Sequence, residues 1–194
     1  MELFSALLHP SDSMRILDIG GRADTWATLD AQPRIELLNL DEGDDPSPLP
    51  GNVVFTRGDA TAVPYDDRCF DIVFSNSVIE HVGDFDAQRR MAGEVRRVAA
   101  AYYVQTPARS FPLEPHYITP FVHWLPRALQ RRILRNFSVW GLITRPSQEF
   151  VDNVVASTRL LTRAELHRLF PDAAIIPERA FGLVKSWIIV RTKE

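Results

Sequence analysis

The stretch RILDIGGRAD, residues 15–24, decides how the rest of the chain is interpreted. Its apolar half is typical of a strand, and Gly20 and Gly21 follow directly. Glycine at a strand end permits a tight turn and lets a ligand approach the backbone. Nucleotide-binding turns usually carry further glycines, whereas this turn continues with Arg22 and Asp24. The turn alone therefore does not establish a nucleotide site, and the other strand ends must support it.

The bulk composition indicates one domain. The chain has 194 residues, of which 45% are hydrophobic and 24% are charged, enough for a single domain with a sizeable core. The net charge of −3 gives no overall attraction to nucleic acid, and we expect no nucleic-acid partner. The single cysteine, Cys69, excludes an internal disulfide and favours a reducing compartment, so we expect a cytoplasmic protein.

Short apolar runs alternate with helical patterns along the chain. Strands are expected over residues 15–20, 35–40, 53–58, 70–77, 99–107, 173–178 and 183–192. Helices are expected within 1–10 and over 24–31, 84–98, 119–137 and 161–171. This alternation predicts an α/β fold, a doubly wound, mostly parallel sheet of seven strands with helices on both faces. The last two strands are too close in sequence for a helix between them, so we expect an antiparallel C-terminal hairpin.

Ligands of such sheets bind beyond the carboxyl ends of the strands, where several residues fit a nucleoside. Asp41 follows the second strand 23 positions after Asp18, the spacing at which a carboxylate accepts both hydroxyl hydrogens of a ribose. Asp59 follows the third strand and can accept a hydrogen bond from the exocyclic amine of a base, while the backbone N–H of Ala60 can donate to its ring. The fourth strand ends in SNSVIEHV, residues 75–82. The four strand ends together are much more specific than any one of them.

In the pieces LDIGG, NLD, GDATAVPYDDRCFDIVFSNSVIEHV and YYVQTP, the sequence resembles class I S-adenosylmethionine-dependent methyltransferases, of the broad type 11-like group that acts on small molecules. The resemblance covers residues 14–107 well and the last strands loosely. It implies a Rossmann-like sheet, S-adenosylmethionine as the cofactor, a small-molecule acceptor and no metal ion. It also implies a single methyltransferase domain over residues 1–194, with a helical lid or insert at about 108–160.

The resemblance implies a set of cofactor-binding residues: Asp18, Gly20, Gly21, Asp41, Asp59, Ala60, Asn76 and Ser77. The glycines are expected against the methionine part of the cofactor, and the carboxylate after the second strand is expected on its ribose. The Asp-Ala pair is expected at the adenine, and the Asn-Ser pair near the sulfonium. Because the cofactor carries a sulfonium and an ammonium, it also accounts for the carboxylates that dominate residues 30–86.

Arg22 and Asp24 depart from the family pattern, which has glycine at both positions. This departure keeps an alternative open, a binding or scaffold protein that has the methyltransferase fold and reduced or lost catalysis. A nicotinamide dehydrogenase would show GxGxxG spacing, whereas the sequence from Gly20 reads GGRADT.

The segment 108–160 is too long for a simple crossover and is where this fold commonly places its acceptor lid. His116 is the candidate general base if the acceptor is a hydroxyl, with a histidine hydrogen-bonded inside a Pro-rich loop as the alternative. The candidate substrate contacts are His81, Arg109, Glu114 and Tyr117. His81 can instead hold its loop onto the following helix, and Arg109 suits a carboxylate or phosphate.

The helix expected over 119–137 combines apolar residues with four arginines, Arg127, Arg131, Arg132 and Arg135. One interpretation is a lid helix packed on the core. The other is an interfacial helix that makes peripheral contact with a membrane lipid or an anionic substrate. We therefore expect an acceptor that is anionic or carries a sugar or a lipid, and the sequence leaves the oligomeric state open.

Overall fold

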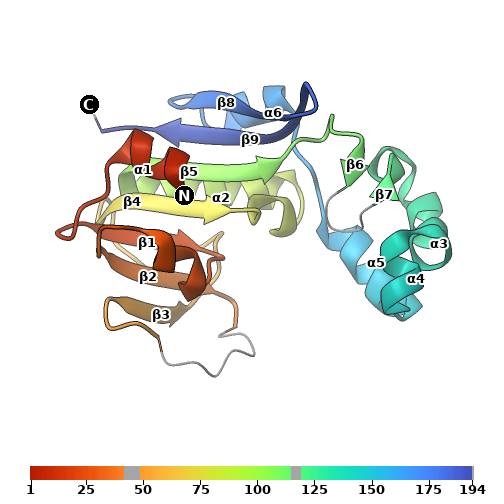
Figure 1. Ribbon diagram of the computed structural model, residues 1–194, viewed down its shortest axis with the longest axis horizontal. Coiled ribbons are helices and arrows are strands. Elements are labelled where there is room, and N and C mark those ends of the chain that lie inside the picture. Colours follow the sequence, from red (N-terminus) through yellow and green to blue (C-terminus); the bar gives the residue numbers. More distant parts are fainter. Residues whose placement is uncertain (42–48, 115–118, 194) are drawn as a thin grey trace.

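A computed structural model of the chain describes residues 1–41, 49–114 and 119–193 (Figure 1). Its main feature is a seven-stranded sheet with the order β3-β2-β1-β4-β5-β9-β8. In chain order the strands are β1 (Arg15–Ile19), β2 (Arg34–Asn39), β3 (Val53–Arg57), β4 (Phe70–Asn76), β5 (Ala99–Pro107), β8 (Ala174–Ala180) and β9 (Leu183–Arg191). The first five run parallel, and β9 is antiparallel to both β5 and β8. The expected fold class and the C-terminal hairpin are confirmed.

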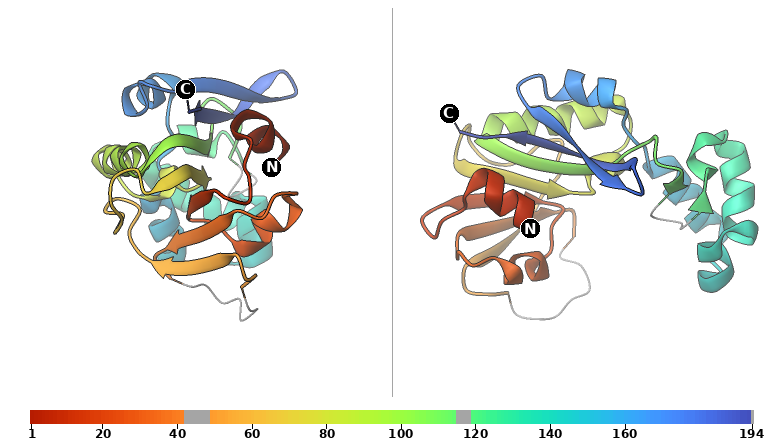
Figure 2. Two further views of the ribbon diagram at one scale, coloured as in Figure 1. Left: turned by 90° about the vertical axis from the view of Figure 1, so that its left-hand side faces the viewer. Right: turned by 45° about the horizontal axis from the view of Figure 1, so that its top comes forward.

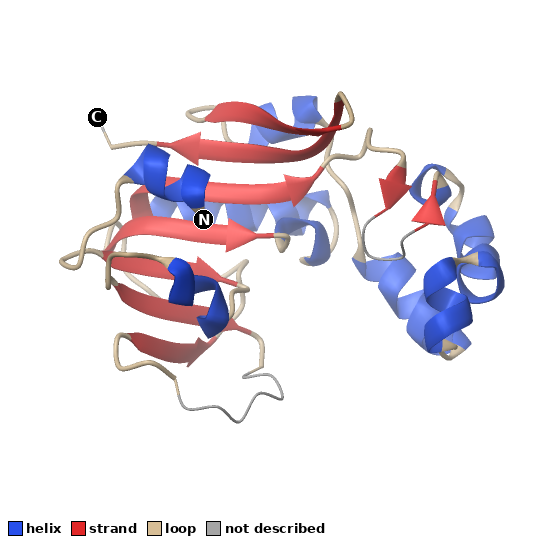
Figure 3. Ribbon diagram, viewed as in Figure 1, coloured by secondary structure: helices blue, strands red, loops and turns tan. Residues whose placement is uncertain are grey.

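Side chains of the central strands alternate between two apolar cores, because successive residues of a strand point to opposite faces of the sheet. Ile16 belongs to the core under α1 (Glu2–Leu8) and the 3-10 helix η1 (Ala23–Thr28). Leu17 belongs to the core under α2 (Phe85–Val98) and α6 (Arg163–Leu169). The sheet is therefore covered on both faces, as Figures 2 and 3 show.

The expected helix over 24–31 is instead the short 3-10 helix η1. The indole Nε1 of Trp26 donates to Asp18 Oδ2 over 2.8 Å, which draws η1 against the end of β1 and favours a tight turn. Residues 58–69, between β3 and β4, form turns and a bridge and contain no helix.

The helix expected over 119–137 is wrong in its extent. The structure has a short strand β7 (Thr119–Pro120), a 3-10 helix η3 (Val122–Trp124) and then α3 (Arg127–Phe137). Pro126 separates η3 from α3, because proline disfavours a helical conformation in the residue before it. Leu125 is accordingly extended, with φ −79° and ψ 157°.

Residues 108–160, here called the insert, also contain β6 (Leu113–Glu114), α4 (Val139–Thr144) and α5 (Gln148–Ser157). The two ends of the insert meet at a bridge between Ala108 and Leu161. The insert has a small core of its own, made of Val122, Leu134, Val151 and Val155. It projects beyond the carboxyl end of β5, at the end of the molecule remote from both termini (Figure 1).

Within the described ranges, no helix combines the length and the apolar character that crossing a membrane requires.

Candidate functional site

The end of β1 places a buried carboxylate beneath a glycine turn. Asp18 is fully buried, and its Oδ2 accepts the hydrogen bond from Trp26. Its Oδ1 is also buried and has no hydrogen-bond partner among the described residues. Burial raises the pKa of Asp18 to about 7, and the hydrogen bond from Trp26 opposes part of that rise. The site thus holds a carboxyl group whose ionised form is compensated only in part, by the hydrogen bond from Trp26.

The turn above Asp18 requires glycine at both positions. A Cβ on Gly21 would lie 1.7 Å from Asp18 Oδ2, so the carboxylate occupies the place of a side chain. Gly20 has φ +73°, and a Cβ there would lie 2.3 Å from a methyl carbon of Val78. Val78 follows β4 and therefore brings the end of β4 against the end of β1. The backbone of Gly20 remains exposed at this edge of the sheet.

The departure from the family pattern, Arg22 and Asp24, is an ion pair in solvent. Arg22 Nη2 lies 3.1 Å from Asp24 Oδ2, and the side chains are 72% and 66% exposed. The hydrogen bond from Arg22 lowers the pKa of Asp24. The guanidinium charge is thus balanced within the turn itself by the carboxylate of Asp24.

The ends of β2 and β3 lie beside that of β1, because these strands are neighbours in the sheet. Asp41 follows β2, is exposed, and lies 3.5 Å from Arg57, which is exposed as well. Asp59 follows β3, is exposed, and accepts a hydrogen bond from the backbone N–H of Thr61 at 2.7 Å. Ala60 packs against the edge of the core. Two carboxylates therefore accompany the glycine turn along one edge of the sheet.

The end of β4 is fixed on β5. Ser77 has φ +58°, and its N–H and hydroxyl donate to the backbone oxygen and to Oε1 of Gln105, each at 3.0 Å. Asn76, directly before it, is exposed. Gln105 holds this turn in place, although nothing in the sequence marks it for that role.

A second set of contacts ties the loop after β4 to the far end of the insert. Glu80 is fully buried and accepts a hydrogen bond from Thr106 Oγ1 at 2.9 Å. Its backbone oxygen accepts from the N–H of Arg159 at 2.7 Å. His81 is exposed, and its Nδ1 lies 3.5 Å from Thr158 Oγ1. The position of the insert therefore depends on the turn that ends β4.

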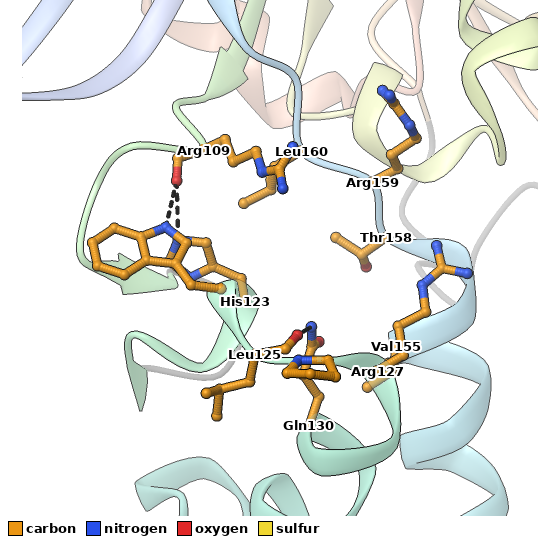
Figure 4. Close-up of a pocket in the computed structure, with 11 residues that line it drawn as sticks. Arg109, His123, Leu125, Arg127, Gln130, Val155, Thr158, Arg159 and Leu160 are labelled. Carbon is orange, nitrogen blue, oxygen red and sulfur yellow. Dashed lines mark hydrogen bonds between the residues drawn. The ribbon is translucent and has the colours of Figure 1, made fainter.

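A cavity of about 380 Å³ lies within the insert, and all the residues that line it fall between Arg109 and Leu160 (Figure 4). Arg109, Arg127 and Arg159 border it on different sides. Arg159 forms an ion pair with Glu165, whereas within the described ranges no carboxylate pairs with Arg109 or Arg127. Trp124 Nε1 donates to the backbone oxygen of Arg109 at 2.8 Å and closes one wall. The cavity thus combines an aromatic wall with uncompensated positive charge, which suits an anionic ligand.

The structure brings most of the residues expected at the site together. Seven lie at the exposed edge formed by β1 to β4: Gly20, Gly21, Asp41, Asp59, Ala60, Asn76 and Ser77. Asp18 lies beneath that edge, Arg109 lies in the cavity wall, and His81 lies next to Thr158 of the same wall.

His116 and Tyr117 lie outside the described residues, as does the side chain of Glu114. The sequence did not point to Trp26, Gln105 or Arg159, because the role of each comes from a contact that only the tertiary structure creates, with Asp18, Ser77 and Glu80 respectively. Within the described ranges, no three His, Cys, Asp or Glu side chains are grouped to hold a metal ion.

The doubly wound sheet with a glycine turn at β1 defines the class of fold, and comparisons with known proteins agree with it. The family model described as a methyltransferase domain matches residues 25–101. A ubiquinone biosynthesis O-methyltransferase of Azorhizobium caulinodans is 28% identical over 141 residues, 64% of this chain and 53% of that protein. The chain thus spans about half the length of this curated relative.

Solved structures share the fold across nearly the whole chain. An S-adenosylmethionine-dependent methyltransferase of Methanosarcina mazei has a TM-score of 0.56 at 16% identity and covers 98% of this chain and 96% of its own. The 1,6-didemethyltoxoflavin-N1-methyltransferase of Burkholderia thailandensis, solved with its acceptor and S-adenosylhomocysteine, has a TM-score of 0.59 at 14% identity and covers 97% and 74%. The family model and the curated relative confirm the resemblance to class I S-adenosylmethionine-dependent methyltransferases, and these solved structures confirm the fold that it implies.

Proposed function

We propose that this chain transfers a methyl group from S-adenosylmethionine to an anionic small molecule bound in the cavity of the insert. The observation that carries the proposal is the end of β1, where Gly20 is exposed and Gly21 lies against the buried carboxyl group of Asp18. Asp18 Oδ1 has no hydrogen-bond partner among the described residues. A nearby ligand that carries an ammonium and a sulfonium would supply the positive charge that the ionised form of this carboxyl group lacks.

The residues along the same edge fit the remaining parts of this cofactor. Asp41 is exposed and would accept hydrogen bonds from the two ribose hydroxyls. Asp59 and Ala60 would hold the adenine through a carboxylate and a backbone N–H. Asn76 and Ser77 would form the floor near the sulfonium, where the contacts of Ser77 with Gln105 keep that floor rigid.

When bound, the cofactor supplies an electrophilic methyl group. Transfer would leave S-adenosylhomocysteine, because the bond from the methyl carbon to sulfur would break as its bond to the acceptor atom formed. The protein's contribution is to hold the acceptor atom in line with that bond, and positioning of this kind accounts for much of the rate in such reactions. For a hydroxyl acceptor, His116 would take the hydroxyl proton.

The cavity within the insert would bind the acceptor. Arg109 and Arg127 would hold a carboxylate or phosphate, because their guanidinium groups form no ion pair within the described ranges. His81, Glu114 and Tyr117 would add further contacts. In this proposal residues 1–194 act as one methyltransferase domain, residues 108–160 serve as its lid, and residues 119–137 contact lipid or lipid-like acceptors. The single cysteine supports placing the protein in the cytoplasm.

Calorimetric titration with S-adenosylmethionine and S-adenosylhomocysteine tests the cofactor assignment. We expect both to bind, and we expect Asp41→Ala to weaken both. Asp86→Ala is the matched control, because Asp86 also forms an exposed ion pair, with Arg89 at 3.0 Å, but lies on α2. Absence of binding at millimolar cofactor would refute the proposal, and equal affinity of the two variants would refute the ribose assignment.

Release of S-adenosylhomocysteine in the presence of anionic metabolite fractions tests the acceptor assignment. We expect Arg109→Gln to lose turnover while it keeps cofactor affinity, and Arg90→Gln, an exposed arginine of α2, to keep both. Cofactor binding without turnover on any fraction would favour the alternative of a methyltransferase-fold binding protein.

A further inference from the structure

The outer face of the insert exposes large apolar side chains at its tip. Phe137, Val139, Leu142 and Ile143 are 77%, 53%, 62% and 76% exposed; we call these four residues the apolar tip. They lie at the end of α3 and on α4, at the end of the molecule farthest from the chain termini (Figure 1). Adjacent exposed apolar side chains of this size are uncommon on monomeric proteins and mark an interaction surface.

The corner between α3 and α4 forces these side chains outward. Gly141 is buried against the end of α3, where a Cβ would lie 2.1 Å from the backbone oxygen of Leu134. Ser138 Oγ accepts from the N–H of Gly141 at 2.8 Å and donates to the same Leu134 oxygen. Because this face of α4 is held against α3, Val139, Leu142 and Ile143 occupy the opposite face. Their exposure is therefore a consequence of specific packing.

The apolar tip belongs to a segment of the chain that is rich in positive charge. Residues 119–148 contain five arginines and no acidic residue: Arg127, Arg131, Arg132, Arg135 and Arg145. Arg131 lies 3.6 Å from Asp152. Arg132, Arg135 and Arg145 form no ion pair with any described residue, and Arg135 and Arg145 flank the apolar tip in sequence. Because the whole chain carries a net charge of −3, the residues outside 119–148 are net negative. Positive charge is therefore concentrated in the insert.

We infer that the apolar tip docks on the surface of an anionic lipid bilayer. Aliphatic and phenyl side chains would enter the boundary between headgroups and acyl chains, while the arginines around them would contact lipid phosphates. The sequence alone suggests lipid contact for 119–137, whereas the exposed apolar residues of this surface are concentrated in 137–143.

A bilayer explains the surface better than a second copy of the chain. In a symmetric dimer the same patch meets itself, so that Arg132, Arg135 and Arg145 of one subunit would face the same arginines of the other. The described part of the insert offers few carboxylates to offset that repulsion. Residues 119–148 contain none, and α5 adds Glu149 and Asp152, of which Asp152 already pairs with Arg131. An anionic membrane supplies the opposite charge and the apolar phase together.

Co-sedimentation with lipid vesicles tests the inference without cofactor or acceptor, so its outcome does not depend on the proposed methyl transfer. We expect the full chain to bind vesicles of equal parts phosphatidylcholine and phosphatidylglycerol, and to bind pure phosphatidylcholine far less. Leu142→Ser combined with Ile143→Ser should weaken binding about tenfold or more, because two apolar side chains no longer insert. The matched control is Phe181→Ser with Leu183→Ser, which removes two exposed apolar residues from the β8–β9 hairpin and should leave binding unchanged.

Charge is tested separately. Arg135→Gln with Arg145→Gln should weaken binding to the anionic vesicles about 30-fold, because each arginine near such a surface contributes about fivefold. Arg90→Gln with Arg168→Gln removes the same charge from exposed positions on α2 and α6 and should have little effect. The inference is overturned if the wild-type chain does not sediment with anionic vesicles, if both vesicle types bind equally, or if the control pairs lose as much binding as the tip pairs. Concentration-dependent dimers in light scattering that the tip variants abolish would favour a second copy instead.

Discussion

Replacement of Asp18 by asparagine should remove the pH dependence that this residue imposes on folding. Burial raises the pKa of Asp18 from 3.8 to about 7, so between these values the folded state holds a proton that the unfolded state has released. The protonated Asp18 side chain therefore contributes its full share to the free energy of unfolding below about pH 4, and this contribution is lost as the pH rises through 7. At about 1.4 kcal/mol per pH unit, the loss amounts to about 4 kcal/mol.

An asparagine side chain at this position would keep the shape of the aspartate and would still accept the hydrogen bond from Trp26, but it cannot ionise. Between pH 4 and pH 8, the wild type should thus lose about 4 kcal/mol of its free energy of unfolding that Asp18→Asn does not lose. The difference between the variant and the wild type should increase by that amount. Urea unfolding at several pH values, followed by tryptophan fluorescence, measures this difference, and the titration of all other groups cancels in it. A difference that stays constant within about 0.5 kcal/mol would show that Asp18 ionises normally and that its environment is not as apolar as the packing indicates.

Two further substitutions test close packing, and a third serves as a control. Gly21→Ala should destabilise the protein by about 2–4 kcal/mol in urea unfolding, because the new Cβ would displace the Asp18 carboxylate. The control is Gly93→Ala on α2, where a new Cβ would meet nothing within 4 Å, and it should stabilise the protein by about 0.5–1 kcal/mol. Gly141→Ala should push α4 away from the Leu134 oxygen at a cost of about 1–3 kcal/mol, visible as faster hydrogen exchange in α3 and α4, and unchanged exchange there would contradict the packing of the corner.

The strands could be predicted because their signal is local. FDIVF at the start of β4 is almost continuously apolar, as a strand covered on both faces must be, and the capping box of Thr162 and Glu165 marks the start of α6. The ends of these strands could also be predicted, since parallel strands bring their carboxyl ends to one edge. The predicted extent of the helix within 119–137 is wrong because Pro126 interrupts an apolar pattern that continues through it.

By itself, the sequence determined the sheet, the glycine turn and the carboxylates that follow β2 and β3, because hydrophobic periodicity and turn chemistry act over a few residues. Only the tertiary structure decided that Arg22 and Asp24 neutralise each other in solvent, that Trp26 holds Asp18, and that Gly141 turns the apolar tip outward. The reason is physical: burial and ion pairing depend on which atoms become neighbours, and those neighbours are set by packing across the whole chain.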